Sequence, residues 1–421
     1  MPLSNFILGK AFFLSQYIIV VRPVCWYSKY RLRLLYNDYI FLMEINHYYA
    51  VITKTKKLAF FCFSCLRLIT IAPYAYFSFY VSTCVTTLVT IQIGYKWPKL
   101  MKNISKCGLD EYVDPRIKFK CYTATAIVFS LAILEHALAL LYRVVHVMLC
   151  HPYQNFFDEF FNDQFPWFFY FDIPTYVPIG IILQVINIIS TLNWNFSDVY
   201  IMCISMYLAS ILEQINKKII KASEKHYLPP SYWRALREDY NRATQLVRSF
   251  DNVVSGIIFS SFASNLFFIC LQLFNILKKC LEFWQHYLSE WQCLFLVPFG
   301  GYEYTIYLSF SVTYLFARSI TVSLLAASVN TASLVPAPAL YNVPSSAFCD
   351  EVSRFIAQVN GDNIALSGLQ FFYATRDLVL SVSVEQNQFI VSYEILIQNF
   401  LQTIIYSNIV SFTDCRNNSN I

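Results

Sequence analysis

Ionisable and amide side chains inside long apolar segments are the residues of this sequence that could do chemistry. Two such segments, residues 121–148 and 173–212, contain Glu135, His136, Trp194, Asn195 and Asp198. If these segments cross a bilayer, a carboxylate near the centre costs roughly 2.5–3.5 kcal/mol unless it faces protein or water. Ionisable groups at that depth are therefore candidates for ligand or ion binding.

A second polar group lies in the last long apolar segment, residues 364–400. Its middle carries Glu385, Gln386, Asn387 and Gln388 in a row. Such a block is costly in hydrocarbon, so we expect it to face protein or water. A helix that lines a path through a bilayer would meet this requirement.

Several kinds of chemistry are not supported by the sequence. It has no glycine-rich phosphate loop, no HExxH and no GxSxG motif. The CxxC pair of Cys62 and Cys65 has no second pair or histidine cluster to complete a metal site. We therefore expect no catalytic residues, metal or cofactor, and the basic loops are read as topology signals rather than nucleic-acid surfaces.

Composition places the chain in a membrane. Of its 421 residues 57% are hydrophobic and 14% charged, and the mean hydropathy is +0.46, whereas soluble domains have about 25% charged residues. We expect a multi-pass protein of the plasma membrane. The nine glycines argue mildly against a secondary transporter, whose broken helices rely on glycine and proline.

The distribution of charge predicts the topology. Segments 1–33, 96–120 and 213–251 are rich in Lys and Arg and read as cytoplasmic, whereas 151–172 carries only acidic charges and reads as external. The expected fold is an all-α membrane protein with seven transmembrane helices, a cytoplasmic N-terminus and an extracellular C-terminus. The expected spans are one within 34–71 and then 72–93, 121–148, 173–212, 253–277, 304–329 and 364–406.

The same analysis divides the chain into segments. Residues 1–33 form a cytoplasmic N-terminus, 34–330 hold six transmembrane helices with cytoplasmic extensions, and 331–363 form a polar cytoplasmic link. Residues 364–406 form the last helix and 407–421 an extracellular tail. The fourth apolar run, about 60 Å long as one helix, is expected to project into the cytoplasm.

A helical seam is predicted in the basic segment 213–251 and just beyond it. Apolar residues recur there at spacings of four and three, the pattern of a helix packing on other helices. They are Leu236, Tyr240, Ala243, Val247, Phe250 and Val254. The seam packs either within one subunit or against another.

Three stretches resemble one known family. They are WRALREDYN from Trp233, ARSITVSLLAASVN from Ala317, and IALSGLQFFYATRDLVLSV with VSYEILIQNF near the C-terminus. Together they resemble the sugar-receptor branch of the insect gustatory receptors over residues 72–400. The resemblance implies a taste receptor that is a ligand-gated, non-selective cation channel, with four subunits, alike or mixed, around one pore.

The resemblance also implies roles for single residues. The last helix would line the pore, and Ser392, Tyr393, Asn399 and Phe400 match or replace the family's terminal motif. Residues 384–389 are longer than the family's linker by about four residues, or roughly 6 Å of helix. The expected partners are a sugar, permeant cations and membrane lipid. A multispan transporter and a non-conducting subunit remain alternatives.

A sugar requires aromatic platforms beside carboxylates or amides. We predict that Glu135, His136, Trp194, Asp198 and Trp167 bind it, with Trp284, Trp291, Tyr302 and Glu303 at the outer edge. The alternatives are that Glu135 and His136 bridge helices and that the outer tryptophans anchor the membrane interface. Arg318 and Arg376 are expected near the cytoplasmic side, as helix-packing or gating contacts rather than at the ligand. Cys280 and Cys293 could pair in an external loop.

Overall fold

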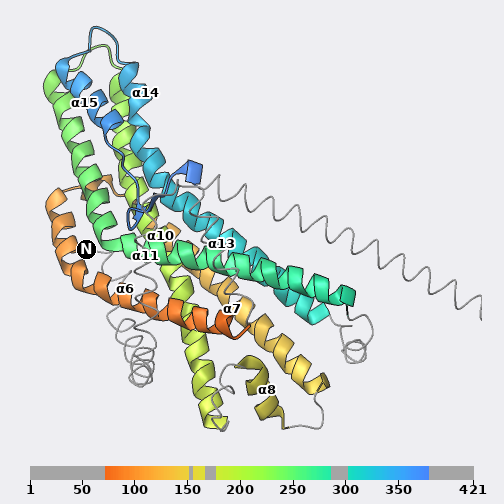
Figure 1. Cartoon of the computed structure of the whole chain (residues 1–421). Coiled ribbons are helices and arrows are strands. Elements are labelled where there is room, and N and C mark those ends of the chain that lie inside the picture. The colour runs from red at the N-terminus through yellow and green to blue at the C-terminus, as the bar shows by residue number, and fades with distance from the viewer. Residues whose placement is uncertain (1–71, 151–154, 166–176, 286–301, 379–421) are drawn as a thin grey trace, which may run out of the picture.

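The computed structural model describes residues 72–150, 155–165, 177–285 and 302–378. The described part is mostly helical (Figure 1). Its long helices are α6 (Ala72–Cys107), α7 (Ile117–Cys150), α10 (Val177–Ser223), α11 (Pro230–Gln285) and α13 (Tyr302–Leu334). The shorter elements are η3 (Asp110–Tyr112), α8 (Phe156–Gln164), α14 (Pro336–Tyr341), α15 (Asp350–Gly361), β1 (Ser367–Gly368) and β2 (Phe372–Tyr373).

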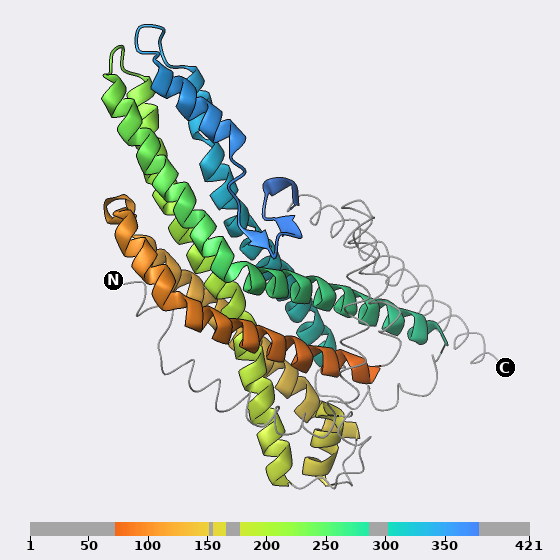
Figure 2. The same cartoon turned by 60° about the vertical axis from the view of Figure 1, so that its left-hand side comes forward.

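Helix α10 is the central helix of this arrangement. It contacts α6, α7, α11 and α13, and its side chains Leu212, Ile215 and Ile219 have no exposed surface. At 47 residues it is roughly 70 Å long, more than twice the hydrocarbon thickness of about 30 Å. The part beyond α6 and α7 forms an arm with α11, α14 and α15 (Figure 2), and α10 continues to Ser223, past the end of the predicted run at residue 212.

The predicted seam on α11 packs within this chain. All six of its residues are at most 4% exposed. The Tyr240 hydroxyl donates to the Ser333 carbonyl of α13 at 2.8 Å, and its ring lies 5.4 Å from that of Phe355 on α15. Of the two alternatives, packing within one subunit therefore accounts for the seam.

The predicted polar link 331–363 is built largely of helix. Helix α13 continues to Leu334, and α14 and α15 follow. Glu351 of α15 accepts a hydrogen bond from Arg237 of α11 at 3.1 Å, with Arg234 at 3.6 Å. Burial alone would raise the pKa of Glu351, but the hydrogen bond and the arginine charges hold it below its usual range. These contacts fasten α15 to α11.

The start of the predicted last helix was wrong. Ser367 pairs with Tyr373 and Gly368 with Phe372 in an antiparallel hairpin, so a helix cannot run from Ile364. The turn residues Leu369 and Gln370 have φ of 50° and 62°, a left-handed conformation that no continuous right-handed helix contains. An apolar run by itself does not distinguish a helix from a buried hairpin.

Four described helices are long and apolar enough to cross a membrane, and they lie at 117–148, 177–223, 230–273 and 304–341. Helix α6 covers the predicted second span. The predicted first span, the block 385–388 and most of the predicted last span lie outside the described residues. The seven-span count and the positions of the termini therefore stay predictions.

We predict that Tyr240→Ala destabilises the folded chain by about 3–5 kcal/mol, because it empties a fully buried aromatic site. The measurement is the thermal midpoint of the detergent-solubilised protein, followed by size-exclusion chromatography. Tyr95→Ala is the matched control, since Tyr95 is 83% exposed. Equal midpoints for the two variants would contradict an intrachain seam.

Candidate functional site

The candidate site is organised around a buried ion pair between α10 and α13. Arg318 Nε lies 2.9 Å from Asp198 Oδ2, and the two side chains are 2% and 0% exposed. The contact is an ion pair by distance, although Nε is off the line of a hydrogen bond. A buried charge is tolerated only when it is paired and further hydrogen-bonded, so the surrounding groups decide whether this pair is stable.

Helix α11 supplies partners to the carboxylate. Ser261 Oγ donates to Asp198 Oδ1, and Asn265 Nδ2 lies 3.2 Å from Asp198 Oδ2. Ser261 and Asn265 are four residues apart and therefore share one face of α11. Both Asp198 oxygens thus have partners besides the charge of Arg318.

The guanidinium of Arg318 is held from α10 and α11. Arg318 Nη1 donates to Asn195 Oδ1, and Nη2 lies 3.3 Å from Asn265 Oδ1. Its Cζ lies 4.2 Å from the centre of the Trp194 ring, a cation–π contact. Trp194 Nε1 also donates to Asn265 Oδ1 at 3.1 Å. The network therefore fixes the rotation of three helices about their axes.

A second polar layer lies towards the start of α13. Ser311 Oγ donates to Glu135 Oε1 of α7 at 2.5 Å, and Gln272 Nε2 of α11 donates to Ser311 Oγ at 2.9 Å. Ser311 precedes Arg318 by seven residues, which is two helical turns or roughly 10 Å along the same face. Glu135 is therefore linked to the buried ion pair through α13.

Histidine 136 has a different neighbour from Glu135. Its Nε2 lies 3.4 Å from Gln184 Nε2 of α10. Adjacent residues of a helix point about 100° apart, so Glu135 turns to α13 while His136 turns to α10. Glu135 and His136 thus contact different helices. This arrangement is also the one expected if the two residues bridge helices instead of binding a ligand.

Short helix α8 is held against α7 and α10. Arg143 Nη1 of α7 donates to the carbonyl of Asp163 at 3.0 Å. The ring of Phe161 lies against Gly180 of α10, where a Cβ would come within 2.4 Å of it. Only glycine permits this approach, and α8 is consequently fixed next to the end of α10 that carries Gln184.

Amide oxygens without partners accumulate in this region. In the described part of the chain, buried side-chain oxygens that accept no hydrogen bond include those of Asn162, Gln164, Gln184 and Gln272. Gln164 is only 5% exposed. Buried acceptors are normally satisfied, so these oxygens are available to hydroxyl donors of a ligand or of water. Other such atoms, among them Tyr200 Oη, lie elsewhere in the chain.

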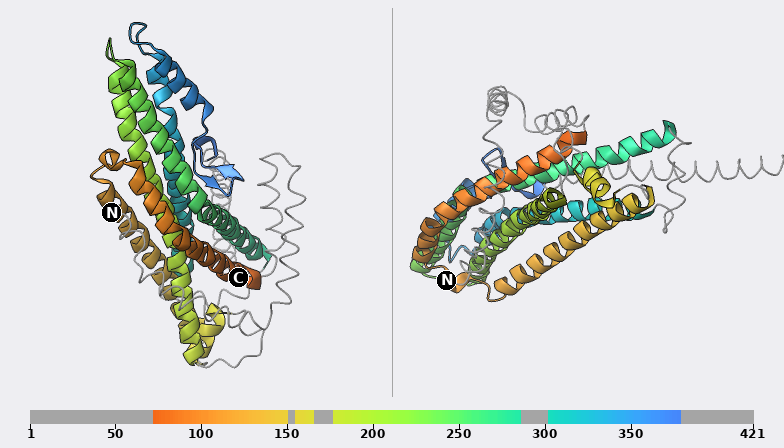
Figure 3. Two further views of the ribbon diagram at one scale, coloured as in Figure 1. Left: turned by 90° about the vertical axis from the view of Figure 1, so that its left-hand side faces the viewer. Right: turned by 90° about the horizontal axis from the view of Figure 1, so that it is seen from below.

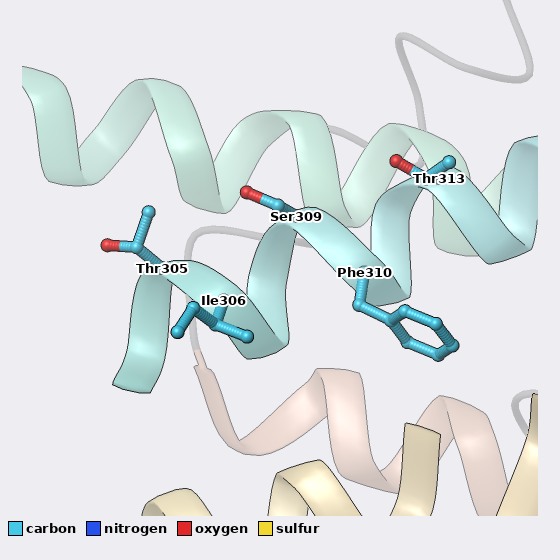
Figure 4. A pocket seen from close by; sticks show the side chains of 5 residues that line it. All are labelled: Thr305, Ile306, Ser309, Phe310 and Thr313. Carbon is cyan, nitrogen blue, oxygen red and sulfur yellow. The ribbon is translucent and has the colours of Figure 1, made fainter. Parts of the chain in front are cut away.

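A shallow groove of about 460 Å³ lies on another face of α13. Its lining side chains all come from that helix, with the hydroxyls of Thr305, Ser309 and Thr313 on one side and Ile306 and Phe310 on the other (Figure 4). The groove includes neither Glu135 nor Asp198. It is therefore distinct from the predicted site.

The β-hairpin is fastened to α11. Asp251 Oδ1 accepts the backbone N–H of Ser367 at 2.6 Å, and Oδ2 accepts the Ser367 hydroxyl at 2.8 Å. The rings of Phe371 and Phe372 lie 5.5 and 5.2 Å from those of Phe259 and Phe262. The helix that holds Asp198 through Ser261 and Asn265 thus also holds the chain just before residue 379.

The predicted residues therefore divide into groups. Asp198 and Trp194 belong to the ion-pair network, and Glu135 and His136 to the second layer. Arg318, expected as a helix-packing or gating contact rather than at the ligand, pairs with Asp198; the only available signal for this partner was that a buried carboxylate needs a cation. Arg376 is exposed after the hairpin. Trp167, Trp291, Cys293 and the motif residues Ser392, Tyr393, Asn399 and Phe400 lie outside the described residues.

Known proteins resemble this chain over most of its length. A family model described as the trehalose receptor matches residues 36–299 and 298–406. In Drosophila melanogaster, the gustatory receptor for sugar taste 64f is 30% identical over 76% of this chain and 64% of its own. The gustatory receptor for sugar taste 64b of the same species is 27% identical over 88% of this chain and 86% of its own.

Two further similarities are weaker. Gustatory receptor 5a for trehalose, also from Drosophila melanogaster, is 27% identical over 72% of this chain and 65% of its own. The chain thus spans less than two thirds of 64f and 5a. The solved olfactory receptor OR5 of Machilis hrabei covers 80% of this chain and 85% of its own, with a TM-score of 0.48 at 14% identity.

We predict that Asp198→Leu and Arg318→Met each destabilise the chain by about 3–5 kcal/mol, because each leaves an unpaired buried charge. The double variant should be more stable than either single variant, since it removes both charges. Thermal midpoints in detergent measure all three. A double variant that loses as much as the two single losses added together would contradict a mutually compensating pair.

Proposed function

The chain belongs to the trehalose receptor family, and we propose on that premise that it is a subunit of a sugar-gated, non-selective cation channel. The observation that carries the proposal is the family match over most of the chain, with relatives named for sugar taste and for trehalose. The chain is a mostly helical, multi-pass membrane receptor and not an enzyme.

The sugar site is proposed in the layer that contains Glu135, His136 and Gln184. A sugar presents many hydroxyl donors, and this layer offers a carboxylate that accepts from Ser311 together with amide oxygens that have no protein donor. Hydrogen bonds to a charged acceptor are the stronger ones. Glu135 is therefore the residue on which we expect affinity to depend most.

Asp198 and Trp194 act in this proposal through the network rather than by direct contact with sugar. Both Asp198 oxygens are engaged by Arg318, Ser261 and Asn265. A ligand would have to displace these groups and leave a charge unpaired, at high cost. Trp167 keeps its predicted role at the ligand, as a proposal.

Opening is proposed to follow from unequal affinity of the sugar for two arrangements of the helices. Sugar hydroxyls that compete for Glu135 would release Ser311 and so alter the position of α13 relative to α7. Helix α11 contacts both the ion-pair network and the hairpin, and this supports a role for α11 in coupling the proposed ligand layer to the proposed pore. Ser392, Tyr393, Asn399 and Phe400 are proposed to line the pore of a tetramer through which cations pass.

We predict that Glu135→Ala raises the sugar concentration for half-maximal current at least about tenfold. Loss of one charge-assisted hydrogen bond is worth about 1.5–3 kcal/mol, and about 1.4 kcal/mol corresponds to tenfold. Currents are recorded from cells with matched surface expression. Glu213→Ala, at an exposed position on α10, is the control and should leave the concentration unchanged. An unchanged value for Glu135→Ala would remove Glu135 from the site.

A separate experiment distinguishes a channel from a transporter. Sugar should evoke currents larger than any transport cycle can carry, and Asn399→Ala should change the relative permeability to Na⁺ and K⁺. Asn417→Ala, in the predicted tail, is the control. Saturable sugar uptake without such current would instead identify a transporter, and current only after co-expression with a related subunit would identify a non-conducting subunit.

A further inference from the structure

A row of lysines occupies one face of the last part of α6. Lys96, Lys99, Lys102 and Lys106 are spaced by three, three and four residues and therefore lie on the same side of the helix. All four are exposed. Among the described residues, none of them forms an ion pair with a carboxylate, in contrast to Lys120, which pairs with Asp114 at 2.9 Å. We call this row the α6 lysine face.

The opposite side of α6 is fixed in the protein core. Trp97 and Leu100 are 6% and 3% exposed, and the Trp97 ring lies 6.3 Å from Tyr200 and 6.4 Å from Phe250. Arg242 Nη1 donates to the carbonyl of Cys107 at 3.1 Å and so holds the end of the helix. Rotation of α6 about its axis would expose Trp97. The lysine face is therefore held on the side of α6 that faces away from the protein core.

The corner between α6 and α7 has further features of a membrane-facing surface. Phe119 and Tyr122, on the first turns of α7, expose 74% and 57% of their surface, and Tyr95, next to Lys96 on α6, exposes 83%. Exposed aromatic side chains are typical of the headgroup level of a bilayer. This corner lies beside the arm formed by α10, α11, α14 and α15, not at its far end (Figure 3). Lysines and aromatic rings therefore occur together near the ends of the apolar parts of two helices.

We propose that the α6 lysine face binds the headgroups of anionic phospholipids, with multiply phosphorylated inositol lipids preferred. Clusters of lysine next to a membrane helix attract anionic lipid, and an ammonium group binds phosphate as a compact charge. Four lysines span about ten residues, or roughly 15 Å of helix, which suits several phosphates better than one. Helix α6 contains Pro98, and its last part bends away from its first part (Figure 1).

This proposal depends on membrane location and not on sugar gating. Lipid bound at the lysine face would stabilise the packing of Trp97 on Tyr200 and Phe250. Helix α6 would then be held by the protein core on one side and by the lipid on the other. A soluble acidic protein would also complement the charge, but it would not account for the adjacent exposed rings. The headgroup of a lipid, with its chains beside those rings, fits both observations.

The test is native mass spectrometry of the detergent-purified full chain with phosphatidylinositol 4,5-bisphosphate or phosphatidylcholine added. The wild-type chain should retain the bisphosphate lipid and not phosphatidylcholine. The triple variant Lys99→Gln, Lys102→Gln, Lys106→Gln should bind the bisphosphate lipid at least tenfold more weakly. The control triple Lys217→Gln, Lys221→Gln, Lys225→Gln removes three other exposed lysines and should bind like the wild type.

Binding by the first triple variant equal to that of the wild type would overturn the proposal, as would equal losses in both triples. A second measurement does not depend on comparing charge variants. Lys102→Cys should react with a maleimide more slowly when the bisphosphate lipid is present. No protection by the lipid, or equal protection by soluble inositol trisphosphate, would show that the surface does not recognise a membrane lipid.

Discussion

The described structure depends above all on the neutralisation of one buried charge pair. Asp198 and Arg318 are in the middle of long helices, where neither charge can reach water, and each is stable only while the other is in place. Asn195, Ser261 and Asn265 form hydrogen bonds with the pair, and the Trp194 ring makes a cation–π contact with the guanidinium. Because these residues come from α10 and α11, the pair sets how α10, α11 and α13 are rotated and aligned.

On either side of this ion pair lies a carboxylate, Glu135 or Asp251, and the polar groups around the two differ in how many of them have a hydrogen-bond partner. Towards the start of α13, Glu135 accepts from Ser311 while nearby amide oxygens have no donor. Along α11 in the other direction, both Asp251 oxygens are bound by Ser367. A polar group without a partner is the one a ligand can satisfy most readily. This contrast is why the ligand site is proposed in the Glu135 layer, whereas the hairpin is attached rigidly.

Periodicity and charge were enough to predict much of the fold. The spacing from Leu236 to Val254 identified a buried face of α11, and the length of the fourth apolar run indicated an overhang. Neither the spacing nor the length predicted which helices the buried face of α11 contacts. The hairpin at 367–373 was missed because a largely apolar run fits a helix as well as a buried strand. The two cross-strand pairs and the left-handed turn residues that distinguish them are seen only in the structure. The pairing of Arg318 with Asp198 was not predicted, because contacts between residues 120 positions apart cannot be read from local spacing.

The position of Asp198 shows how ligand recognition and structural support can be separated within one polar network. Its carboxylate would be a good acceptor for a hydroxyl, which is why its residue type suggested a ligand. Each of its oxygens already has a partner, and breaking the contact with Arg318 would leave a desolvated cation. Within the described residues, Glu135 has one side-chain partner, Ser311, to release. In the proposed function a hydroxyl-rich ligand would replace that serine at smaller cost, and a shift of Ser311 would be carried over two turns of α13 towards Arg318.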